Sequence, residues 1–243
     1  MTKTWPLLFA LAACTDDPEP AFEPTAFTAR VRGPLAGPDL AAAKARHDGI
    51  AMGAHAQATA AGDFAHHVLL GTEHAGTPRD EFLAIDQWTS LDGANALYGD
   101  PDFQAAQGTL FTAPPNVQLF ARRTDWHSWG EMGSGRTTGQ PFWFAIVQGR
   151  LARDTVADNQ LAHDEVAGGN EAIAAAAGDI AHLPHLAVDD PRVFFNVDIW
   201  SSEQGMLATF GNPDFQAQFQ TLFESPPEVR IYRSTDWYQW YAP

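Results

Sequence analysis

The sequence is poor in cysteine and in basic residues, and both shortages limit what the protein can do. Its 243 residues include one cysteine, Cys14, and only two lysines, Lys3 and Lys44. A single cysteine excludes an intramolecular disulfide. With 30 acidic against 14 basic residues, the formal net charge is −16 at pH 7. Such a charge repels the phosphates of nucleic acids and of anionic membrane surfaces, so we expect no nucleic-acid partner.

Several signatures of catalysis and of ligand binding are also missing. The sequence has no G-x-S-x-G motif, and the glycine-rich segment 133–139 lacks the Lys-Ser/Thr ending of a phosphate-binding loop. No closely spaced set of metal ligands is present. His47, His66 and Asp86 could form a facial triad, but spacing alone does not indicate that three separate elements meet. We therefore expect no metal and no bound cofactor.

The first residues have the layout of an export signal. A short apolar run, Trp5 to Ala13, follows Lys3 and ends directly before Cys14. This layout resembles the lipobox of bacterial lipoproteins, in which the signal is cut before a cysteine that is then acylated. The run is too short to span a bilayer, which takes roughly 20 apolar residues. The alternative is an ordinary start region with a chance cysteine.

The lipoprotein interpretation implies a location. Residues 1–13 would be the signal, Cys14 the lipidated residue, and 14–26 an acidic, proline-rich tether with too little apolar surface to pack. Thr15 follows the cysteine. An aspartate at this position would resemble a signal for retention at the inner membrane, whereas threonine resembles a signal for export to the outer membrane. We therefore expect a protein of the bacterial cell envelope, anchored in the outer membrane and facing the periplasm.

A long segment of the chain occurs twice. Residues 88–117 and 200–229 are identical at sixteen of thirty positions, and an offset of 116 aligns His47-Asp48 with His163-Asp164 and Gly62-Asp63 with Gly178-Asp179. Unrelated segments would not match so often. We therefore expect two tandem repeats, residues 27–129 and 141–243, joined by a glycine-rich linker at 130–140.

Each repeat has the same predicted order of elements. In the first, strands are expected at 27–35, 64–71, 82–88 and 117–123, a long helix at about 38–61, and two short helices between the last two strands. Ser90 and Ser202 are suitable N-caps, and Asp100-Pro101 and Asn212-Pro213 each indicate a new helix start. The order βαββαβ predicts an α+β protein of two ferredoxin-like repeats packed sheet to sheet.

These features resemble a known family. A βαββαβ unit whose third strand ends in acid-x-Trp, as at 86–88 and 198–200, followed by an Asp/Asn-Pro-x-Phe helix break, is similar to the antibiotic biosynthesis monooxygenase-like domains of the dimeric α/β-barrel superfamily. The resemblance implies a single-chain dimeric α/β barrel, a monomer with an internal pseudo-dimer. It also implies a cofactor-independent oxygenase that binds or acts on a small apolar or aromatic molecule. A non-catalytic scaffold lipoprotein is the alternative.

One branch of the superfamily is disfavoured by position. In its haem-degrading members a catalytic tryptophan and a histidine would fall on Leu97 and Gln107 of the first repeat. In the second repeat they would fall on Thr209 and Phe219. Neither repeat has the pair, so haem degradation is not expected.

Histidines and acids at equivalent places in both repeats are the candidate catalytic residues, because histidine transfers protons near neutral pH. The candidates are His47, His66 and Asp86 in the first repeat and His163, His182, Asn196 and Asp198 in the second. A helix histidine and a strand histidine could meet between helices and sheet. The alternative is that they are core histidines, duplicated only with the gene. A pocket of several hundred Å3 beside them would favour an enzyme.

Two tryptophans three residues apart close each repeat, Trp126 and Trp129 in the first and Trp237 and Trp240 in the second. We expect them to clamp one half against the other, with an aromatic ligand platform as the alternative.

Overall fold

The computed structural model describes residues 22–37, 39–134 and 141–242. The expected signal segment 1–13, the predicted lipidation residue Cys14 and residues 135–140 of the expected linker lie outside the described residues. In the part of the chain that is described, no helix has both the length and the hydropathy needed to cross a membrane.

The elements follow the predicted order twice. The first half consists of β1 (Phe27–Pro34), α1 (Leu40–Ala60), β2 (Asp63–Gly71), a 3-10 turn η1 (His74–Gly76), β3 (Glu81–Trp88), α2 (Leu91–Tyr98), α3 (Pro101–Gly108) and β4 (Asn116–Arg122). The second half consists of β5 (Trp143–Arg150), α4 (Val156–Ala177), β6 (Asp179–Ala187), β7 (Val193–Trp200), α5 (Glu203–Phe210), α6 (Pro213–Gln220) and β8 (Glu228–Ser234), followed by the short β9 (Trp240–Tyr241). The predicted α+β class is confirmed.

Polar side chains begin the short helices where the sequence predicts. The Ser90 hydroxyl accepts the Gly93 N–H at 3.1 Å, and the Ser202 hydroxyl accepts the Gly205 N–H at 3.0 Å. Asp100 and Asn212 cap α3 and α6, and a proline follows each of them at the first helical position. These side chains satisfy N–H groups that have no partner inside the helix, which is why each helix starts there.

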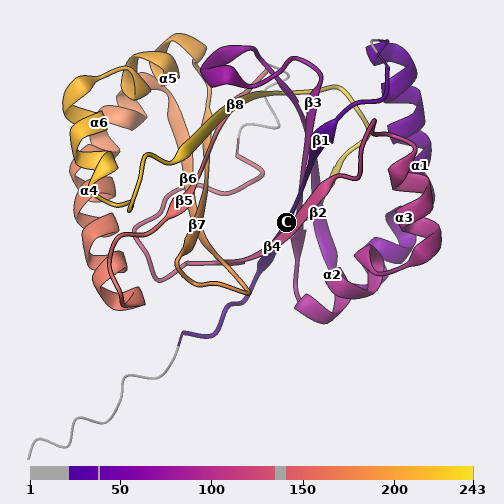
Figure 1. Cartoon of the computed structure of the whole chain (residues 1–243), viewed down its shortest axis with the longest axis horizontal. Coiled ribbons are helices and arrows are strands. Elements are labelled where there is room, and N and C mark those ends of the chain that lie inside the picture. Colours follow the sequence, from indigo (N-terminus) through magenta and orange to yellow (C-terminus); the bar gives the residue numbers. More distant parts are fainter. Residues whose placement is uncertain (1–21, 38, 135–140, 243) are drawn as a thin grey trace, which may run out of the picture.

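Eight strands close into an antiparallel barrel. Each half forms its own four-stranded sheet, and β4 pairs with β6 while β2 pairs with β8, so both seams between the halves are hydrogen bonded. The strand β9 adds to β2. The two sheets therefore meet along their edges as well as face to face. Figure 1 shows α1–α3 covering one side of the barrel and α4–α6 the other.

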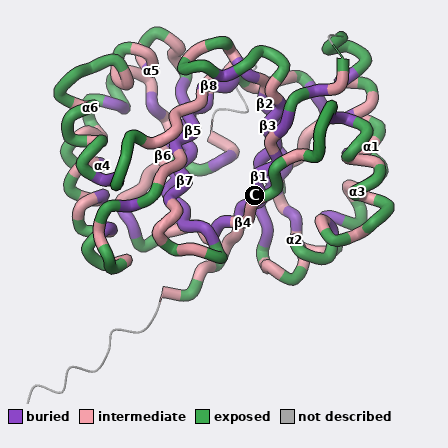
Figure 2. The backbone as a smooth tube through the Cα atoms, in the orientation of Figure 1, coloured by how far each residue is buried: buried purple, intermediate pink, exposed green. Residues whose placement is uncertain are grey.

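The two faces of the sheets bury different cores. The barrel interior holds a central cluster from both halves, in which the rings of Phe120 and Phe195 stack at 4.4 Å between centroids. Met132, from the start of the expected linker, packs into this cluster. The outer faces pack against the helices, and the buried stretches in Figure 2 follow the strands of both halves. Each half therefore has a second core between its helices and its sheet.

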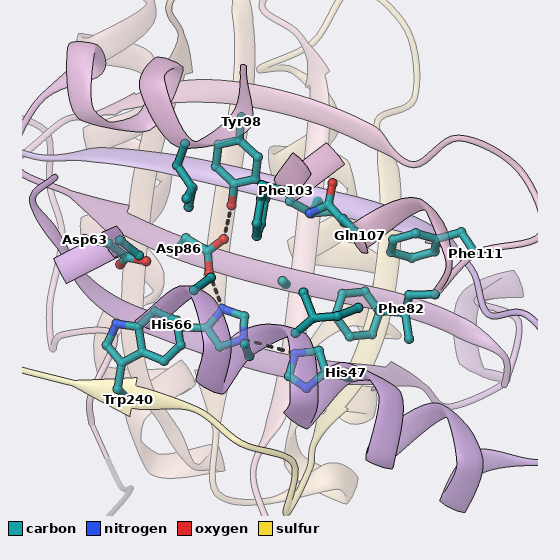
Figure 3. A pocket seen from close by; sticks show the side chains of 18 residues that line it. His47, Asp63, His66, Phe82, Asp86, Tyr98, Phe103, Gln107, Phe111 and Trp240 are labelled. Carbon is teal, nitrogen blue, oxygen red and sulfur yellow. Dashed lines mark hydrogen bonds and ion pairs between the residues drawn. The ribbon is translucent and has the colours of Figure 1, made fainter. Parts of the chain in front are cut away.

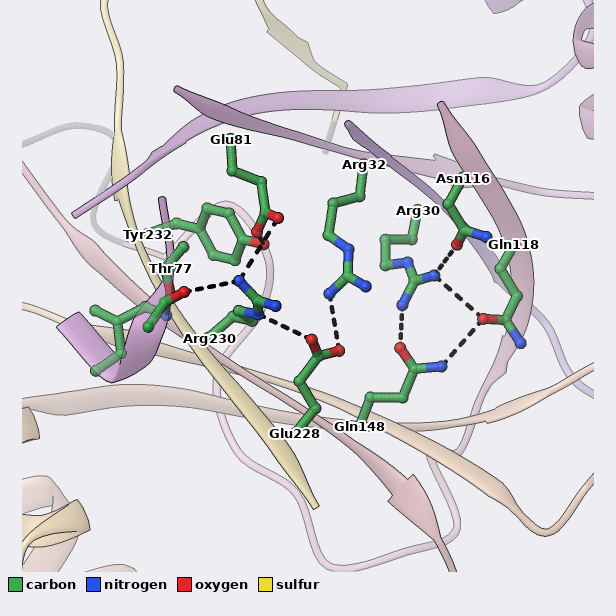
Figure 4. Close-up of polar contacts among 12 residues, drawn as sticks. Arg30, Arg32, Thr77, Glu81, Asn116, Gln118, Gln148, Glu228, Arg230 and Tyr232 are labelled. Atoms are coloured by element: carbon green, nitrogen blue, oxygen red, sulfur yellow. Dashed lines mark hydrogen bonds and ion pairs between the residues drawn. The ribbon is translucent and has the colours of Figure 1, made fainter. Parts of the chain in front are cut away.

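One end of the barrel interior is polar. Arg30 on β1 donates to Asn116, Gln118 and Gln148, and burial lowers its pKa to about 10. Beside it, Glu228 accepts hydrogen bonds from Arg32 and Arg230, each at 2.8 Å (Figure 4). These residues come from both halves, so the network joins them at this end.

The end segments of the two halves are exchanged. Trp126 packs against His163 and Phe194 of the second half, while Trp237 packs against His47 and Phe82 of the first. The backbone N–H of Tyr238 donates to Asp48, and that of His127 donates to Asp164, both at 2.7 Å. The expected clamp is confirmed, and each half completes the helix-facing core of the other.

Candidate functional site

The predicted histidines of the first half form a buried chain of hydrogen-bonded side chains. His47 Nδ1 lies 3.0 Å from Asp48 Oδ1, His47 Nε2 lies 3.1 Å from His66 Nε2, and His66 Nδ1 lies 2.5 Å from Asp86 Oδ1. The hydroxyl of Tyr98 donates to the other oxygen of Asp86 (Figure 3). We call Asp48, His47, His66 and Asp86 the first relay.

The second half contains the equivalent chain. His163 Nδ1 lies 2.9 Å from Asp164, the two Nε2 atoms of His163 and His182 are 3.0 Å apart, and His182 Nδ1 lies 2.6 Å from Asp198. Asn196 donates its side-chain N–H to Asp198 at 2.7 Å. We call Asp164, His163, His182 and Asp198 the second relay. The structure thus brings together all seven predicted residues, in two groups.

The local structure explains why the residues meet. His66 and Asp86 are direct cross-strand partners in the pairing of β2 with β3, as His182 and Asp198 are in β6 and β7. Such partners on one face lie within side-chain reach. His47 and His163 lie on the buried sides of α1 and α4, which pack over these strands. A bulge after Asp63 and after Asp179 sets the register of each pair.

Counting protons shows what the first relay can do. Its three contacts need three hydrogens, but two neutral imidazoles supply only two. An ionised carboxylate only accepts, so each Nδ1 donates to its acid and the contact between the two Nε2 atoms then lacks a hydrogen. The relay is therefore completed by taking up one proton, which makes it a base.

Burial and hydrogen bonds set the protonation states at the helix end of each relay. Burial lowers the pKa of His47 to about 4, so His47 is neutral at pH 7. Burial would raise the pKa of Asp48, but hydrogen bonds from Lys44 and the Tyr238 N–H lower it. Asp48 thus stays ionised and holds the Nδ1 proton of His47. Burial likewise lowers the pKa of His163 to about 4.

A protonated carboxyl faces each relay. Burial and then the charge of Asp86 raise the pKa of Asp63 to about 9, and burial and the charge of Asp198 do the same for Asp179. Both are therefore neutral acids at pH 7. A carboxyl group that burial keeps protonated at pH 7 can serve as an acid in its pocket.

A small cavity lies against each relay, between the helices and the sheet. The first cavity is about 50 Å3 and is lined by Asp63, His66 and Trp240 together with apolar side chains of α1 and α3. The second is about 60 Å3 and is lined by Asp179, His182 and Trp129. Each holds a few water molecules at most. The predicted histidines and acids line these cavities, but the expected volume of several hundred Å3 is not observed, because aromatic side chains fill the space.

Each pocket takes a tryptophan from the opposite half. Trp240 stacks on His66 at 4.5 Å between centroids, and Trp129 stacks on His182 at 4.6 Å. The outer tryptophan of each pair therefore lines a pocket while the inner one packs in the core. Neither site is complete without the other half.

The two pockets differ at six equivalent lining positions. At four of them, Tyr98, Ala84, Leu97 and Gln107 of the first pocket correspond to Phe210, Asn196, Thr209 and Phe219 of the second. At the other two, Ile50 and Ala54 correspond to Val166 and Asn170. The second pocket is therefore the more aromatic.

Some site residues were not predicted from the sequence. Asp48, Asp63 and their counterparts Asp164 and Asp179 stand in the repeated His-Asp and Gly-Asp pairs, so repetition itself was the available signal. Tyr98 has no such signal, since the second half has phenylalanine there. In the described part of the chain, no group of three or more His, Cys, Asp or Glu residues is arranged to hold a metal ion.

Comparisons with known proteins support the fold. No protein-family model matches the sequence, and no curated protein does. The structure is similar to that of a proposed monooxygenase from Lactobacillus acidophilus NCFM, with TM-score 0.58 and 10% identity, over 87% of this chain and 95% of the other. It is also similar to an anthrone oxidase-like protein, with TM-score 0.62 and 14% identity, over 89% and 94%.

A chlorite dismutase from Candidatus Nitrospira defluvii gives TM-score 0.52 and 9% identity, over 88% of this chain and 93% of that one. At such identities the likeness shows a shared fold of the monooxygenase-like, ferredoxin-like kind. The activity has to be argued from the site.

Proposed function

We propose that the chain binds a small apolar or aromatic molecule and removes a proton from it, in the manner of a cofactor-independent monooxygenase. The observation that carries the proposal is the pair of buried relays, each of which gains a hydrogen bond by accepting one proton and each of which borders an apolar cavity. The structural similarity to a proposed monooxygenase and to an anthrone oxidase-like protein supports it.

The residues divide the work between a base and an acid. A phenolic O–H or an activated C–H of the ligand breaks, its proton goes to the relay through His66 or His182, and the electron pair stays on the ligand as an anion. The neutral carboxyl of Asp63 or Asp179 donates a hydrogen bond to the oxygen that becomes negative. Dissolved dioxygen would then be the oxidant, with no cofactor. An anthrone anion would become a quinone that keeps one oxygen atom while the other leaves as water, and a hydroquinone anion would lose its second proton and two electrons to give a quinone and hydrogen peroxide.

The ligand needs more room than the cavities have, and the outer wall can supply it. No residue of α3 or α6 is buried, and Phe103 and Gln107 on α3 are half-buried. A helix that buries little surface shifts at low cost. We therefore place the entrance between α1 and α3 in the first half, and between α4 and α6 in the second.

Oxygen uptake tests the proposal. The parent chain is mixed with a panel of catechol, hydroquinone and anthrone in air-saturated buffer, and consumption is compared with that of His66→Gln, His182→Gln and the double variant. We expect uptake above the buffer rate for at least one compound, and a fall of about 100-fold in the double variant, as for loss of a general base. Parental rates in a folded double variant would exclude the relays as catalysts.

A non-catalytic scaffold is the second candidate, and the small cavities favour it. If no compound of the panel is consumed or bound by the parent chain, the relays act as buried structural networks that join helix, sheet and exchanged segment.

We also propose that the protein is a lipoprotein of the bacterial outer membrane, facing the periplasm, and that its two halves arose by duplication to give a monomer with an internal pseudo-dimer. The first proposal rests on the apolar run before Cys14, the second on the repeated sequence and element order. Incorporation of a labelled fatty acid by the parent chain and not by Cys14→Ser tests the anchor. Light scattering tests the monomer.

A further inference from the structure

Asn196 carries a buried acceptor that the protein does not satisfy. The residue is 2% exposed on β7 and lines the second cavity. Its side-chain nitrogen faces Asp198 at 2.7 Å, so its oxygen points away from that carboxylate, and this oxygen has no hydrogen-bond partner. The opposite amide orientation would bring two acceptor oxygens together. A buried carbonyl oxygen without a partner is rare and requires an explanation.

The first pocket shows how the chain avoids the same problem. The registers of β1 with β3 and of β5 with β7 place Ala84 where the second half has Asn196. Ala84 has no polar side-chain atom to satisfy at that place, and the hydroxyl of Tyr98 already donates to Asp86. The first pocket therefore supplies its own aromatic hydroxyl to the relay.

The second pocket lacks that hydroxyl. Phe210 replaces Tyr98, and Phe219 replaces Gln107. The rings of Phe210, Phe215 and Phe219 contact one another at 5.4 to 6.4 Å between centroids. The wall beside Asn196 is thus aromatic and offers a ligand no competing charge.

From this asymmetry, we propose that the second pocket is the ligand site and that Asn196 selects the ligand. The ligand class is a compact, uncharged ring bearing a hydroxyl, whose O–H donates to Asn196 Oδ1 and whose ring packs among the phenylalanines. In the first pocket the hydroxyl of Tyr98 takes the place of the ligand's hydroxyl, and that pocket serves the fold. This inference rests on the proposed function, since it names which pocket performs it and for which ligand.

Phenol and toluene form a matched pair of probes, because they have similar size and differ in the hydroxyl. The indole N–H signals of Trp129 and Trp240 report separately on the second and first pockets in a proton–nitrogen NMR titration of the full chain. We expect phenol to shift the Trp129 signal and leave Trp240 unmoved. Toluene should bind at least about tenfold more weakly, as expected for one lost hydrogen bond at a buried acceptor.

Two variants sharpen the test. Asn196→Ala installs the first pocket's residue and should abolish the preference for phenol over toluene. Ala84→Asn is the matched change in the first pocket and should not create binding there, since Tyr98 still occupies the site. Equal shifts at both tryptophans, equal binding of both probes, or no phenol binding would each overturn the inference. The parent comparison stands even if a variant fails to fold.

Binding and chemistry are separable in this design. Phenol bound at Asn196 with no oxygen uptake in any assay would leave the inference standing and remove the proposed reaction. Oxygen uptake that survives in Asn196→Ala, with the same preference among compounds, would overturn the inference and leave the proposed reaction standing.

Discussion

Trp240, at the end of the second half, stacks on His66 of the first half, with the ring planes 26° apart. The same relationship joins Trp129 to His182 in the other direction. Because each half supplies a ring to the other's relay, the two sites are products of the assembled barrel.

Removal of one stacking tryptophan should destabilise the whole chain and disturb one relay. For Trp240→Ala we expect the free energy of unfolding in urea to fall by about 2–4 kcal/mol, somewhat less than for a fully buried tryptophan, because Trp240 is half-buried. Trp129→Ala is the matched variant and should cost a similar amount. Histidine NMR signals should move at His66 in the first variant and at His182 in the second. Signals that move at both sites in both variants would contradict the crossed arrangement.

Stability should fall at alkaline pH because of Asp63 and Asp179. Their pKa is raised from 3.8 to about 9 in the folded chain. The folded state therefore holds more protons than the unfolded state in this window, and the stabilisation present below pH 3.8 is lost as the pH rises toward 9. We expect the free energy of unfolding to drop by roughly 2 kcal/mol for each carboxyl, about 4 kcal/mol together, from pH 7 to 8.5.

Asp63→Asn/Asp179→Asn is the control for this prediction, since an amide cannot ionise and keeps the shape. Its unfolding free energy should be nearly flat over the same interval. His47 and His163 affect stability at lower pH, because burial lowers their pKa from 6.5 to about 4. They add stability as the pH rises from 4 to 6.5, so they do not contribute to the change between pH 7 and 8.5. An unchanged alkaline slope in the double variant would refute the assignment.

Tyr98→Phe should cost about 1–2 kcal/mol of stability, because Asp86 loses a hydrogen-bond donor in a buried place. The reciprocal change, Phe210→Tyr, gives Asp198 a further donor. It should raise the free energy of unfolding by up to the same amount. Thermal unfolding of both variants measures the pair. Equal effects of the same sign would show that the hydroxyl makes no specific contact with the relay acid.

The polar end of the barrel gives a salt-dependent prediction. Glu228 is half-buried between Arg32 and Arg230, and these contacts lower its pKa although burial opposes them. Glu228→Gln should therefore lower stability by about 1–2 kcal/mol, less in high salt. The exposed pair of Arg79 with Glu73 is the control, and Glu73→Gln should change stability by less than about 0.5 kcal/mol. Equal losses would mean that burial does not matter here.

Much of the fold could be predicted because local signals and the repeat agreed. Ser90, Asp100 and their counterparts cap the helices as expected, since capping depends on a few neighbouring residues. The histidine pairs were found because both copies have them. Tyr98 and the orphan oxygen of Asn196 could not be found this way, because they belong to one copy only and their role depends on what surrounds them.

The size of the pockets was the expectation that the structure changed. A volume of several hundred Å3 was expected of an enzyme, but side-chain rings from α2, α3 and the exchanged segment enter that space. Volume is the sum of many packing contacts across distant segments, and no local pattern reports it.

By itself, the sequence determined the element order, the caps and which residue types recur, because these depend on neighbours within a few positions. Only the tertiary structure decided that β4 meets β6, that the last tryptophans cross to the opposite half, and that one relay ends in its own Tyr98 while the other leaves Asn196 unsatisfied. These outcomes arise from contacts between residues far apart in the chain. Hydrogen-bond satisfaction and close packing select them over the whole molecule at once.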